Sequence, residues 1–326
     1  MSRRRIRITA LILLVLGSAL GGLAGCTDRA GIGVSADAVQ STSPLPTRPS
    51  PTSGSAPAPS QTKAGAVSVY RDIVYREASG EQLRLDVCRR ARGADGPRPA
   101  VLLIHGGAFV AGDKDTPKWQ ELCSWLAESG YVAVNLNYRL APVHRFPAAI
   151  EDVQAAVEWT RANALTNGVD PDRVGVLGGS AGANLAQLLG TSGAGSTSLG
   201  SRVAAVVSLS GAADLTERAL TLGDPEPTQI RRVLDYLGCV ELTTCPAGAP
   251  ASPITQVDPS DPPFLLAQSE EESLPVEQTE VMADALTEVG AQPEVLIRPG
   301  RAHATGLLDD PSVTAAVLAF LARTLG

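Results

Sequence analysis

Histidine, aromatic residues and positive charge are all scarce in this sequence. Its 326 residues include only 3 His and 4% aromatic residues, and 27 Lys+Arg stand against 34 Asp+Glu, which gives a formal net charge of -7. Without a basic surplus to neutralise phosphates, the composition excludes nucleic-acid binding as the main function. The few His, together with 5 Cys that form no CxxC pair, lead us to expect no metal site.

Proline and glycine, by contrast, are plentiful, with 24 Pro and 32 Gly in the chain. Residues 41–60 contain 6 Pro, 6 Ser and 3 Thr, so they cannot bury a core. We therefore expect a solvated tether over residues 26–66 that is partly in the polyproline II conformation. Residues 67–326 are then expected to form one α/β domain, whose size suits a single large core.

Residues 1–25 have the pattern of a secretory signal. Four Arg precede an apolar run over residues 10–16, and small residues follow up to Leu23-Ala24-Gly25-Cys26. This ending resembles a bacterial lipobox, which implies that Cys26 is lipidated and becomes the mature N-terminus. We therefore expect an exported protein that a lipid anchor holds at the outer face of the bacterial cell membrane. An ordinary cleaved signal and an uncleaved anchor are the alternatives.

Apolar runs and amphipathic patterns alternate along residues 67–326. This alternation predicts a doubly wound, mainly parallel sheet of eight strands with helices on both faces. The first two strands have no helix between them and should form an antiparallel edge, and residues 213–260 are interpreted as a small insertion. The expected strands span Val67–Tyr75, Leu83–Cys88, Pro99–Ile104, Tyr131–Asn137, Arg173–Leu177, Val203–Leu209, Pro263–Gln268 and Pro293–Arg298, and the expected helices span Trp119–Glu128, Ala148–Ala164, Ala183–Leu189, Val276–Val289 and Ser312–Leu325.

A candidate nucleophile lies in the segment Gly178-Gly179-Ser180-Ala181-Gly182, which fits GxSxG. It follows a predicted strand directly and precedes a predicted helix, which is the setting that a nucleophile elbow requires. Small flanking residues allow Ser180 a strained backbone, and the Ala181 N–H at the helix N-terminus can face a developing oxyanion. The alternative is a Gly-rich turn in which Ser180 only caps the helix.

A second loop supplies the other half of a possible oxyanion hole. His105-Gly106-Gly107-Ala108 follows the buried strand that ends at residue 104. Its small residues let backbone N–H groups turn toward a substrate carbonyl, so we expect Gly107 and Ala108 to be the donors. His105 is interpreted as a structural residue of this loop. The alternative is a simple turn that ends the strand.

Together these motifs resemble the α/β-hydrolase superfamily, and more narrowly the carboxylesterases related to hormone-sensitive lipase and to bacterial feruloyl/acetyl-xylan esterases. The matching stretches are HGGAFVAGDK from His105, NYRLAP from Asn137, RFPAAIEDVQAAVEW from Arg145, DPDRVGVLGGSAGANLA from Asp170 and SLSGAADL from Ser208. The resemblance implies an α/β-hydrolase fold, a Ser–acid–His triad in that chain order, acyl-enzyme chemistry and no cofactor.

The general base is expected at His303, which follows the last predicted strand. An α/β-hydrolase places its catalytic histidine on that loop, whereas His105 belongs to the oxyanion loop and His144 to a loop before the elbow. A histidine titrates near neutral pH, so His303 can take the proton of Ser180 and return it to the leaving group. A surface histidine without a role is the alternative.

The triad acid is less well defined, because the sequence departs from its relatives here. Relatives often read HGxxDxxVP, whereas this chain reads QSEEESLP over residues 268–275, with no Asp and one residue fewer. Counting forward from Gln268 indicates Glu272, and counting back from Pro275 indicates Glu271. We favour Glu272 and keep Glu271 as the alternative acid. The less favoured candidates are Glu270 and Asp214.

The four remaining cysteines invite two disulfides in an exported protein. Cys239 and Cys245 lie six residues apart within the insertion, and Cys88 would then pair with Cys123. Four free buried thiols are the alternative.

The sequence therefore predicts a serine carboxylesterase that acts on a small-molecule ester with a short- to medium-length acyl chain. The low aromatic content and the lack of a long lid segment favour such esters over long-chain lipids. One alternative is an amidase or peptidase of the same fold. Another is a non-catalytic surface binding protein on a degraded hydrolase scaffold, which the missing HGxxD motif would allow.

Overall fold

The structure is a computed structural model that describes residues 67–91 and 96–326. The expected signal (1–25), the tether (26–66) and the lipid-bearing Cys26 lie outside the described residues and stay predictions. No helix in the described part of the chain has the length and apolar character needed to cross a membrane.

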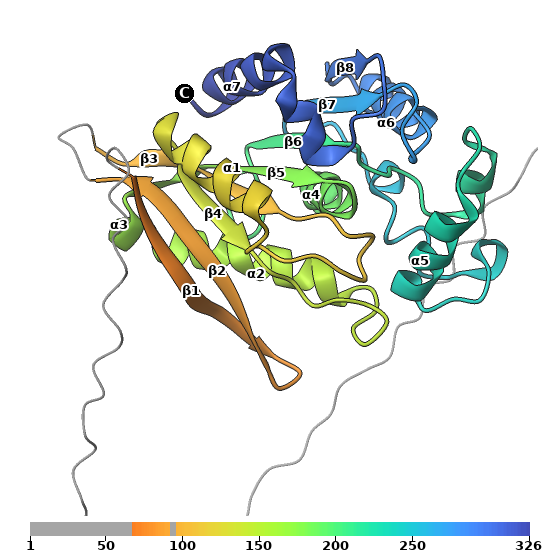
Figure 1. The fold of residues 1–326 in the computed structure, drawn as a ribbon, viewed down its shortest axis with the longest axis horizontal. Helices are drawn as coiled ribbons and strands as arrows, with labels where there is room; N and C mark the ends of the chain where they lie inside the picture. The colour runs from red at the N-terminus through yellow and green to blue at the C-terminus, as the bar shows by residue number, and fades with distance from the viewer. Residues whose placement is uncertain (1–66, 92–95) are drawn as a thin grey trace, which may run out of the picture. The chain divides into compact units, whose positions relative to one another are not determined.

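One sheet of eight strands lies at the centre of the described domain (Figure 1). Its strand order is β1-β2-β4-β3-β5-β6-β7-β8, and only the β1–β2 and β2–β4 pairs are antiparallel. This confirms the predicted mainly parallel sheet with an antiparallel edge. The strands are β1 (Val67–Ala78), β2 (Glu81–Arg90), β3 (Arg98–Ile104), β4 (Val132–Leu136), β5 (Val169–Gly179), β6 (Ala205–Leu209), β7 (Phe264–Ser269) and β8 (Glu294–Arg298).

Helices cover both faces of this sheet. Buried side chains of α1 and α7 pack on one face, and those of α2, α4 and α6 pack on the other. The α-helices are α1 (Pro117–Glu128), α2 (Ala148–Ala162), α3 (Ala164–Asn167), α4 (Ala181–Thr191), α5 (Pro227–Leu237), α6 (Glu277–Glu288) and α7 (Pro311–Leu325), and the short 3-10 helices are η1 (Glu217–Thr221), η2 (Leu242–Thr244), η3 (Pro253–Thr255) and η4 (Ala304–Asp309).

The central strand β3 explains why its sequence is a continuous apolar run. Successive side chains of a strand point to opposite faces, so a strand covered on both faces needs apolar residues at every position. Leu102 and Ile104 belong to the hydrophobic cluster with α2, α4 and α6, whereas Val101 and Leu103 belong to the cluster with α1 and α7. Such a strand is fixed in place by packing from both sides.

Most element boundaries lie within a few residues of the predicted ones, and two of the differences have local reasons. Helix α1 begins at Pro117 instead of residue 119, because a proline suits the first turn of a helix. Strand β5 begins at Val169 instead of residue 173, and its pairing with β3 is irregular before residue 174. The side chain of Asp170 bonds the N–H of Asp172 at 3.1 Å, so the segment has turn chemistry inside a strand.

The insertion over residues 213–260 contains η1, α5, η2 and η3. Figure 1 shows α5 apart from the helices that cover the sheet, on the side toward which β5 and β6 point. The Cys239–Cys245 disulfide closes a short loop directly after α5, and Cys88–Cys123 joins β2 to α1. Both disulfides are the pairings predicted from the sequence.

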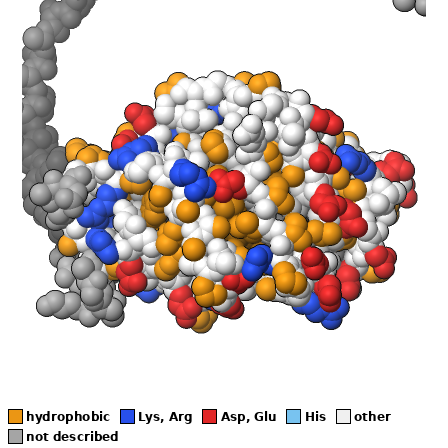
Figure 2. Space-filling model, turned by 90° about the horizontal axis from the view of Figure 1, so that it is seen from above, with side chains coloured by type: hydrophobic (Ala, Val, Ile, Leu, Met, Phe, Trp, Pro, Cys, Tyr) orange, Lys and Arg blue, Asp and Glu red, His pale blue; other side chains and the backbone are white. Residues whose placement is uncertain are grey.

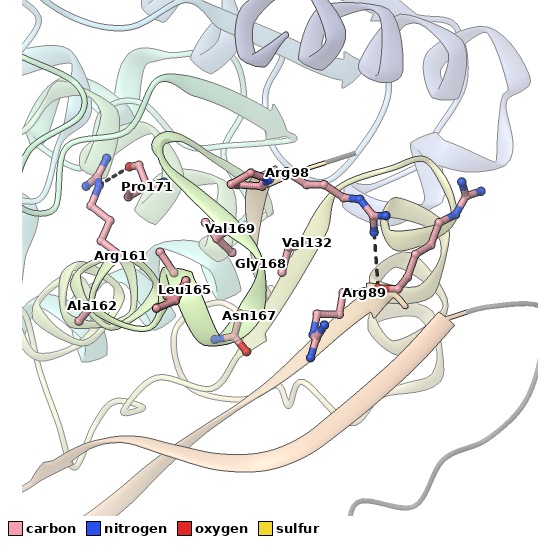
Figure 3. A pocket seen from close by; sticks show the side chains of 14 residues that line it. Arg89, Arg98, Val132, Arg161, Ala162, Leu165, Asn167, Gly168, Val169 and Pro171 are labelled. Atoms are coloured by element: carbon pink, nitrogen blue, oxygen red, sulfur yellow. Dashed lines mark hydrogen bonds between the residues drawn. The ribbon is translucent and has the colours of Figure 1, made fainter. Parts of the chain in front are cut away.

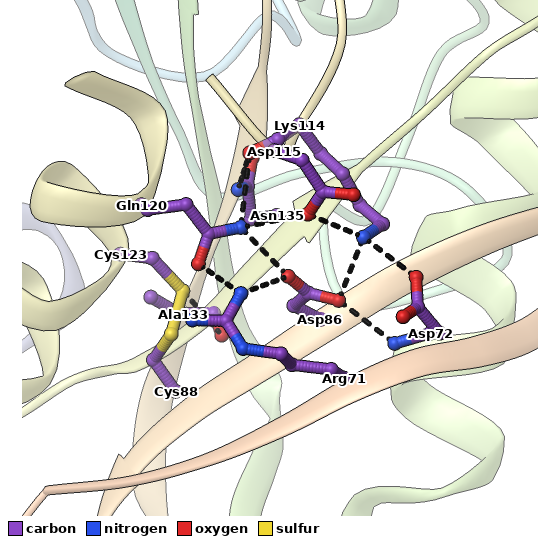
Figure 4. The surroundings of a disulfide bond; sticks show 10 residues. All are labelled: Arg71, Asp72, Asp86, Cys88, Lys114, Asp115, Gln120, Cys123, Ala133 and Asn135. Atoms are coloured by element: carbon purple, nitrogen blue, oxygen red, sulfur yellow. Dashed lines mark hydrogen bonds and ion pairs between the residues drawn. A yellow bond between two sulfur atoms is a disulfide. The ribbon is translucent and has the colours of Figure 1, made fainter. Parts of the chain in front are cut away.

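Beside the disulfide between β2 and α1, a lysine is buried among carboxylates (Figure 4). Lys114 is 1% exposed, and its Nζ lies 2.9 Å from Asp72 Oδ1, 3.0 Å from Asp86 Oδ1 and 2.8 Å from Asp115 Oδ1. Burial opposes the charge, but the hydrogen bonds that Lys114 donates to these carboxylates overcome this effect and raise the pKa of Lys114. We call these four residues the Lys114 cluster.

The charged surface is mixed. On the face shown in Figure 2, several Lys and Arg side chains lie toward the left, most Asp and Glu side chains lie toward the right, and hydrophobic side chains lie between them. This face carries no continuous basic patch of the kind that nucleic-acid binding requires.

Candidate active site

Ser180 lies at the sharp turn between β5 and α4. Its backbone has φ +55° and ψ -119°, a conformation that is strained for any residue other than glycine. The Ser180 N–H donates to the carbonyl of Leu209 at the end of β6 (2.9 Å), and the Ser180 carbonyl accepts from the N–H of Ala183 (2.9 Å). The strained turn is therefore held by the neighbouring strand and by the first turn of α4.

Two glycines of the elbow are required by close backbone contacts. A Cβ atom added at Gly178 would lie 2.0 Å from the carbonyl oxygen of Gly182, and one added at Gly182 would lie 2.1 Å from that of Ile104. No side chain fits at such distances. The end of β3 therefore packs directly against the start of α4, which brings the loop after β3 next to Ser180.

The loop after β3 has the properties expected of an oxyanion loop. Gly107 and Ala108 have φ values of +127° and +53°, and the Gly107 carbonyl accepts from the N–H of Ala111 at 3.0 Å, which closes the loop on itself. Within residues 67–91 and 96–326, no acceptor is found for the N–H groups of Gly107, Ala108 or Ala181. These three predicted donors are therefore available to a ligand.

His105 is a structural residue of this loop, as the sequence indicated. Its ring is 1% exposed, stacks on Tyr138 with 4.4 Å between ring centroids, and donates through Nδ1 to the Gly106 carbonyl at 2.8 Å. The Tyr138 hydroxyl donates to the His105 carbonyl at 2.9 Å. Burial lowers the pKa of His105, so its imidazole is neutral at physiological pH.

His303 lies between β8 and η4, and its Nδ1 is hydrogen-bonded to Oε2 of Glu272. The other carboxylate oxygen, Oε1, accepts the N–H of Ser269 at the end of β7 at 3.2 Å. The Glu272 side chain is fully buried, whereas that of His303 is 34% exposed. A buried carboxylate on one ring nitrogen fixes the imidazole tautomer, with the proton on Nδ1 and the Nε2 lone pair free.

The other candidate acids lie elsewhere. The exposed carboxylate of Glu271 is 3.7 Å from the Arg301 guanidinium, and Glu270 is exposed as well. Asp214 accepts the N–H and the hydroxyl of Thr216 at 2.8 and 2.6 Å, so it stabilises a turn. Of the acids considered, Glu272 is the one that reaches His303.

Two serines that the sequence reasoning missed hold the histidine loop. The hydroxyl of Ser269 donates to the Ala302 carbonyl at 2.7 Å, and the hydroxyl of Ser210 accepts the N–H of Ala304 at 2.9 Å. Both serines directly end or follow a parallel strand, β7 and β6 respectively. Polar residues at the carboxyl ends of parallel strands were the available signal. Together they fix the backbone on both sides of His303.

A single pocket of about 480 Å³ brings the predicted residues together. Ser180, His303, Gly107 and Ala108 all line it, whereas Ala181, the first residue of α4, is buried and is not among the lining residues. Further lining residues, which the sequence did not indicate, are Thr116, Trp119, Gln229, Arg232, Ser273 and Thr305. In the described part of the chain, no group of three or more His, Cys, Asp or Glu residues could hold a metal ion.

A larger pocket of about 590 Å³ lies at the opposite edge of the sheet, where β3 and β5 begin (Figure 3). Three of its four described arginines donate to main-chain carbonyls, for example Arg161 to Pro171 at 2.9 Å, and Arg89 donates to the Tyr70 hydroxyl at 3.0 Å. No Ser, Cys, His, Asp or Glu occurs among its described lining residues. This pocket offers no nucleophile or base among its described lining residues, whereas the predicted Ser180 and His303 line the smaller pocket.

The sequence of this chain is similar to those of known proteins. The family model BD-FAE matches residues 85–286. The probable carboxylic ester hydrolase LipM of Mycobacterium tuberculosis is 33% identical over 248 residues, which cover 73% of this chain and 56% of LipM. Esterase LipC of the same organism is 34% identical over 276 residues, which cover 78% of this chain and 66% of LipC. The chain thus spans between about half and two thirds of the length of these relatives.

A solved structure supports the fold. The esterase of Pyrobaculum calidifontis superimposes with a TM-score of 0.65 at 27% identity, over 81% of this chain and 88% of that one. With the strand order and the elbow, this likeness confirms the predicted α/β-hydrolase fold.

Proposed function

Since the chain belongs to the BD-FAE family of α/β-hydrolase proteins, we propose that it is a serine carboxylesterase that hydrolyses short- to medium-chain acyl esters. One observation carries the proposal. A serine on a strained elbow lines the same pocket as a histidine whose other ring nitrogen is bound by a buried carboxylate. That combination is what nucleophilic acyl transfer requires.

In the first half of the reaction, Ser180 Oγ attacks the ester carbonyl carbon while His303 Nε2 takes the hydroxyl proton. The carbonyl oxygen becomes an oxyanion, which the N–H groups of Gly107, Ala108 and Ala181 stabilise. The tetrahedral intermediate collapses when the carbon–oxygen bond to the alcohol breaks. The imidazolium of His303 gives its proton to the departing alkoxide, and the acyl group stays on Ser180.

In the second half, water attacks the acyl-enzyme while His303 takes a proton from it. The same N–H groups stabilise the second oxyanion, and the bond to Ser180 Oγ breaks with return of the proton. The products are the carboxylic acid and the free serine. Glu272 stays ionised throughout, orients the imidazole and stabilises the imidazolium.

Glu272 also bears on the alternative of a degraded, non-catalytic scaffold. That alternative was motivated by the missing Asp in the acid loop. A glutamate side chain is one methylene longer than aspartate, and here it spans the shortened loop to reach His303. The departure from the family pattern therefore supports an intact triad.

The proposed acyl length follows from the pocket. Its volume of about 480 Å³ must hold both the acyl and the alcohol part, and many of its lining side chains are polar. The test is a panel of 4-nitrophenyl esters from acetate to palmitate, with 4-nitroanilides of the same acids and Ser180→Ala as control. We expect the highest kcat/KM at short to medium chains and little anilide cleavage. Activity that Ser180→Ala retains would contradict the proposal.

We also propose that the enzyme is exported and lipid-anchored through Cys26. The arginine-rich head, the apolar run and the Leu-Ala-Gly-Cys ending support this, and two disulfides suit an oxidising compartment. Metabolic labelling with a palmitate analogue tests it. The wild-type protein should carry label in the membrane fraction, and Cys26→Ser should carry none.

A further inference from the structure

Helix α5 of the insertion brings two polar side chains to the pocket that holds Ser180 and His303. Gln229 and Arg232 both line that pocket. They lie three residues apart on the helix and therefore share one face. Among the described residues, neither side chain has a hydrogen-bond or ion-pair partner. Their donors are free to bind a ligand.

The helix that carries them is held firmly. The Tyr236 ring is buried and stacks on Phe109, next to the oxyanion loop, with 3.8 Å between ring centroids. The Tyr236 carbonyl accepts the N–H of Phe146 at 2.8 Å. At its end α5 is closed by Gly238 at φ +72°, and the disulfide of Cys239 follows at once. A side chain on a fixed helix is a better specificity element than one on a loop.

The charge of the pocket makes Arg232 distinctive. It is the one Lys or Arg among the pocket's described lining residues, and Asp113 is the one carboxylate there. Asp113 already accepts the N–H of Asp115 at 2.8 Å. A guanidinium presents a fork of N–H donors that matches the two oxygens of a carboxylate, and an amide N–H beside it adds a further donor. A neutral ester would leave this fork facing water.

We propose that Arg232, together with Gln229, binds a carboxylate group of the substrate, so that the enzyme prefers esters that carry a negative charge. This inference rests on the proposed esterase function and adds the substrate class to it. Arg232 acts on substrate binding and has no part in proton transfer.

The test compares charged esters with neutral partners of nearly the same size. One pair, 4-acetoxybenzoate and 4-acetoxybenzamide, places the charge on the alcohol part. The other pair, mono-4-nitrophenyl glutarate and its terminal amide, places it on the acyl part. The quantity measured is the ratio of kcat/KM for the charged and the neutral member of each pair.

In the wild-type enzyme we expect one pair to show a ratio well above one. Arg232→Gln should lower that ratio about tenfold, mainly by raising KM for the charged ester, because a charge-assisted hydrogen bond is lost. Arg232→Lys should retain part of the preference. Arg231→Gln is the matched control, since Arg231 is exposed like Arg232 but does not line the pocket, and it should leave the ratio unchanged. Salt near 1 M, where the Debye length is about 3 Å, should shrink the wild-type ratio.

An unchanged ratio in Arg232→Gln for both pairs overturns the inference, and so does an equal loss in Arg231→Gln. Failure of the proposed function looks different, because wild-type enzyme would then hydrolyse none of the four esters. Unfolding curves of the three variants identify any loss of activity that comes from misfolding. If Arg232→Gln is misfolded, the charged-to-neutral ratio of Arg232→Lys decides the test.

Discussion

The Lys114 cluster and the His303–Glu272 pair each contain a fully buried carboxylate that contacts a basic side chain, but they leave different groups open. Lys114 is 1% exposed, and its three donors meet three carboxylates. His303 is 34% exposed, has one nitrogen bound to Glu272, and lines a pocket. A cluster in which every hydrogen-bond donor has a partner stabilises the fold. A pair that leaves one ring nitrogen without a partner can bind and exchange a proton. A charged group that still has a free donor or acceptor beside a cavity can therefore take part in binding or catalysis. A charged group whose donors are all bonded inside the protein stabilises the fold instead.

The largest effect that we expect is a loss of kcat on substitution of Glu272, which substitution of its neighbour Glu271 should not cause. In Glu272→Gln the amide can donate to Nδ1 of His303, so the ring proton moves to Nε2, which can no longer accept from Ser180. We expect kcat to fall about 10³- to 10⁴-fold. Stopped-flow or steady-state hydrolysis of 4-nitrophenyl acetate measures it.

Glu271→Gln is the matched control for that experiment, since its carboxylate is exposed and lies 3.7 Å from Arg301. It should change kcat by less than about twofold, as surface substitutions away from a site usually do. Equal losses in both variants would show that the acid loop works as a whole and that Glu272 has no special role.

The next effect concerns stability instead of rate. Lys114→Met removes the positive charge that lies 3.0 Å from the fully buried Asp86, which then keeps Arg71 as its one cationic partner among the described residues. We expect the free energy of unfolding to fall by about 3 kcal/mol, the cost of breaking a buried ion pair. Urea unfolding followed by tryptophan fluorescence measures the change.

Lys118→Met provides the comparison, because Lys118 pairs with Asp309 at 2.6 Å on the surface, where both side chains are substantially exposed. Exposed pairs contribute at most about 1 kcal/mol. A Lys114→Met protein as stable as Lys118→Met would contradict the structural role of the cluster.

The smallest effect is the pH dependence of the Lys114 cluster. The hydrogen bond from Lys114 lowers the pKa of Asp72 below its ordinary value of 3.8. A carboxyl group with a lowered pKa in the folded state stabilises the protein above its unfolded pKa, and this stabilisation is lost as the pH falls through the folded pKa. The stability difference between wild type and Lys114→Met should therefore shrink below about pH 4. A difference that stays constant from pH 6 to pH 3 would contradict this.

The sequence alone was enough to predict Ser180 as the nucleophile and His303 as the base, because each prediction rests on a local pattern. Ser180 lies in a Gly-rich turn between a buried strand and a helix, and the close contacts of Gly178 and Gly182 show why that pattern is needed. His303 follows the last strand, where the fold places a base. The succession of strands and helices follows from the periodicity of apolar residues, which the sequence displays directly.

The acid could not be decided in the same way. Glu271 and Glu272 are adjacent in a short loop, and the choice depends on how that loop is pinned. The N–H of Glu271 donates to the carbonyl of Gly300 at 3.0 Å, beyond β8, and this sends the Glu271 side chain outward. A contact between residues so far apart in the chain has no signature in either local segment.

The positions of the insertion helix and of the buried Lys114 were harder still to predict from the sequence. Arg232 and Gln229 lie on a helix of the insertion that Tyr236 anchors by stacking on Phe109, in a loop more than a hundred residues earlier. Lys114, in a Gly- and Asp-rich loop, has the composition of an exposed turn, and its burial depends on carboxylates from β1 and β2. Such features follow from tertiary packing, which overrides local propensity.

The most direct test of the central claim is a mass measurement after reaction with a fluorophosphonate. We predict one adduct per folded, oxidised chain, located on Ser180 by peptide mapping. The adduct should be absent in Ser180→Ala and should form far more slowly in His303→Ala. A protein that stays unmodified, or that carries the adduct on another residue, would contradict the assignment of Ser180, His303 and Glu272 as a catalytic triad.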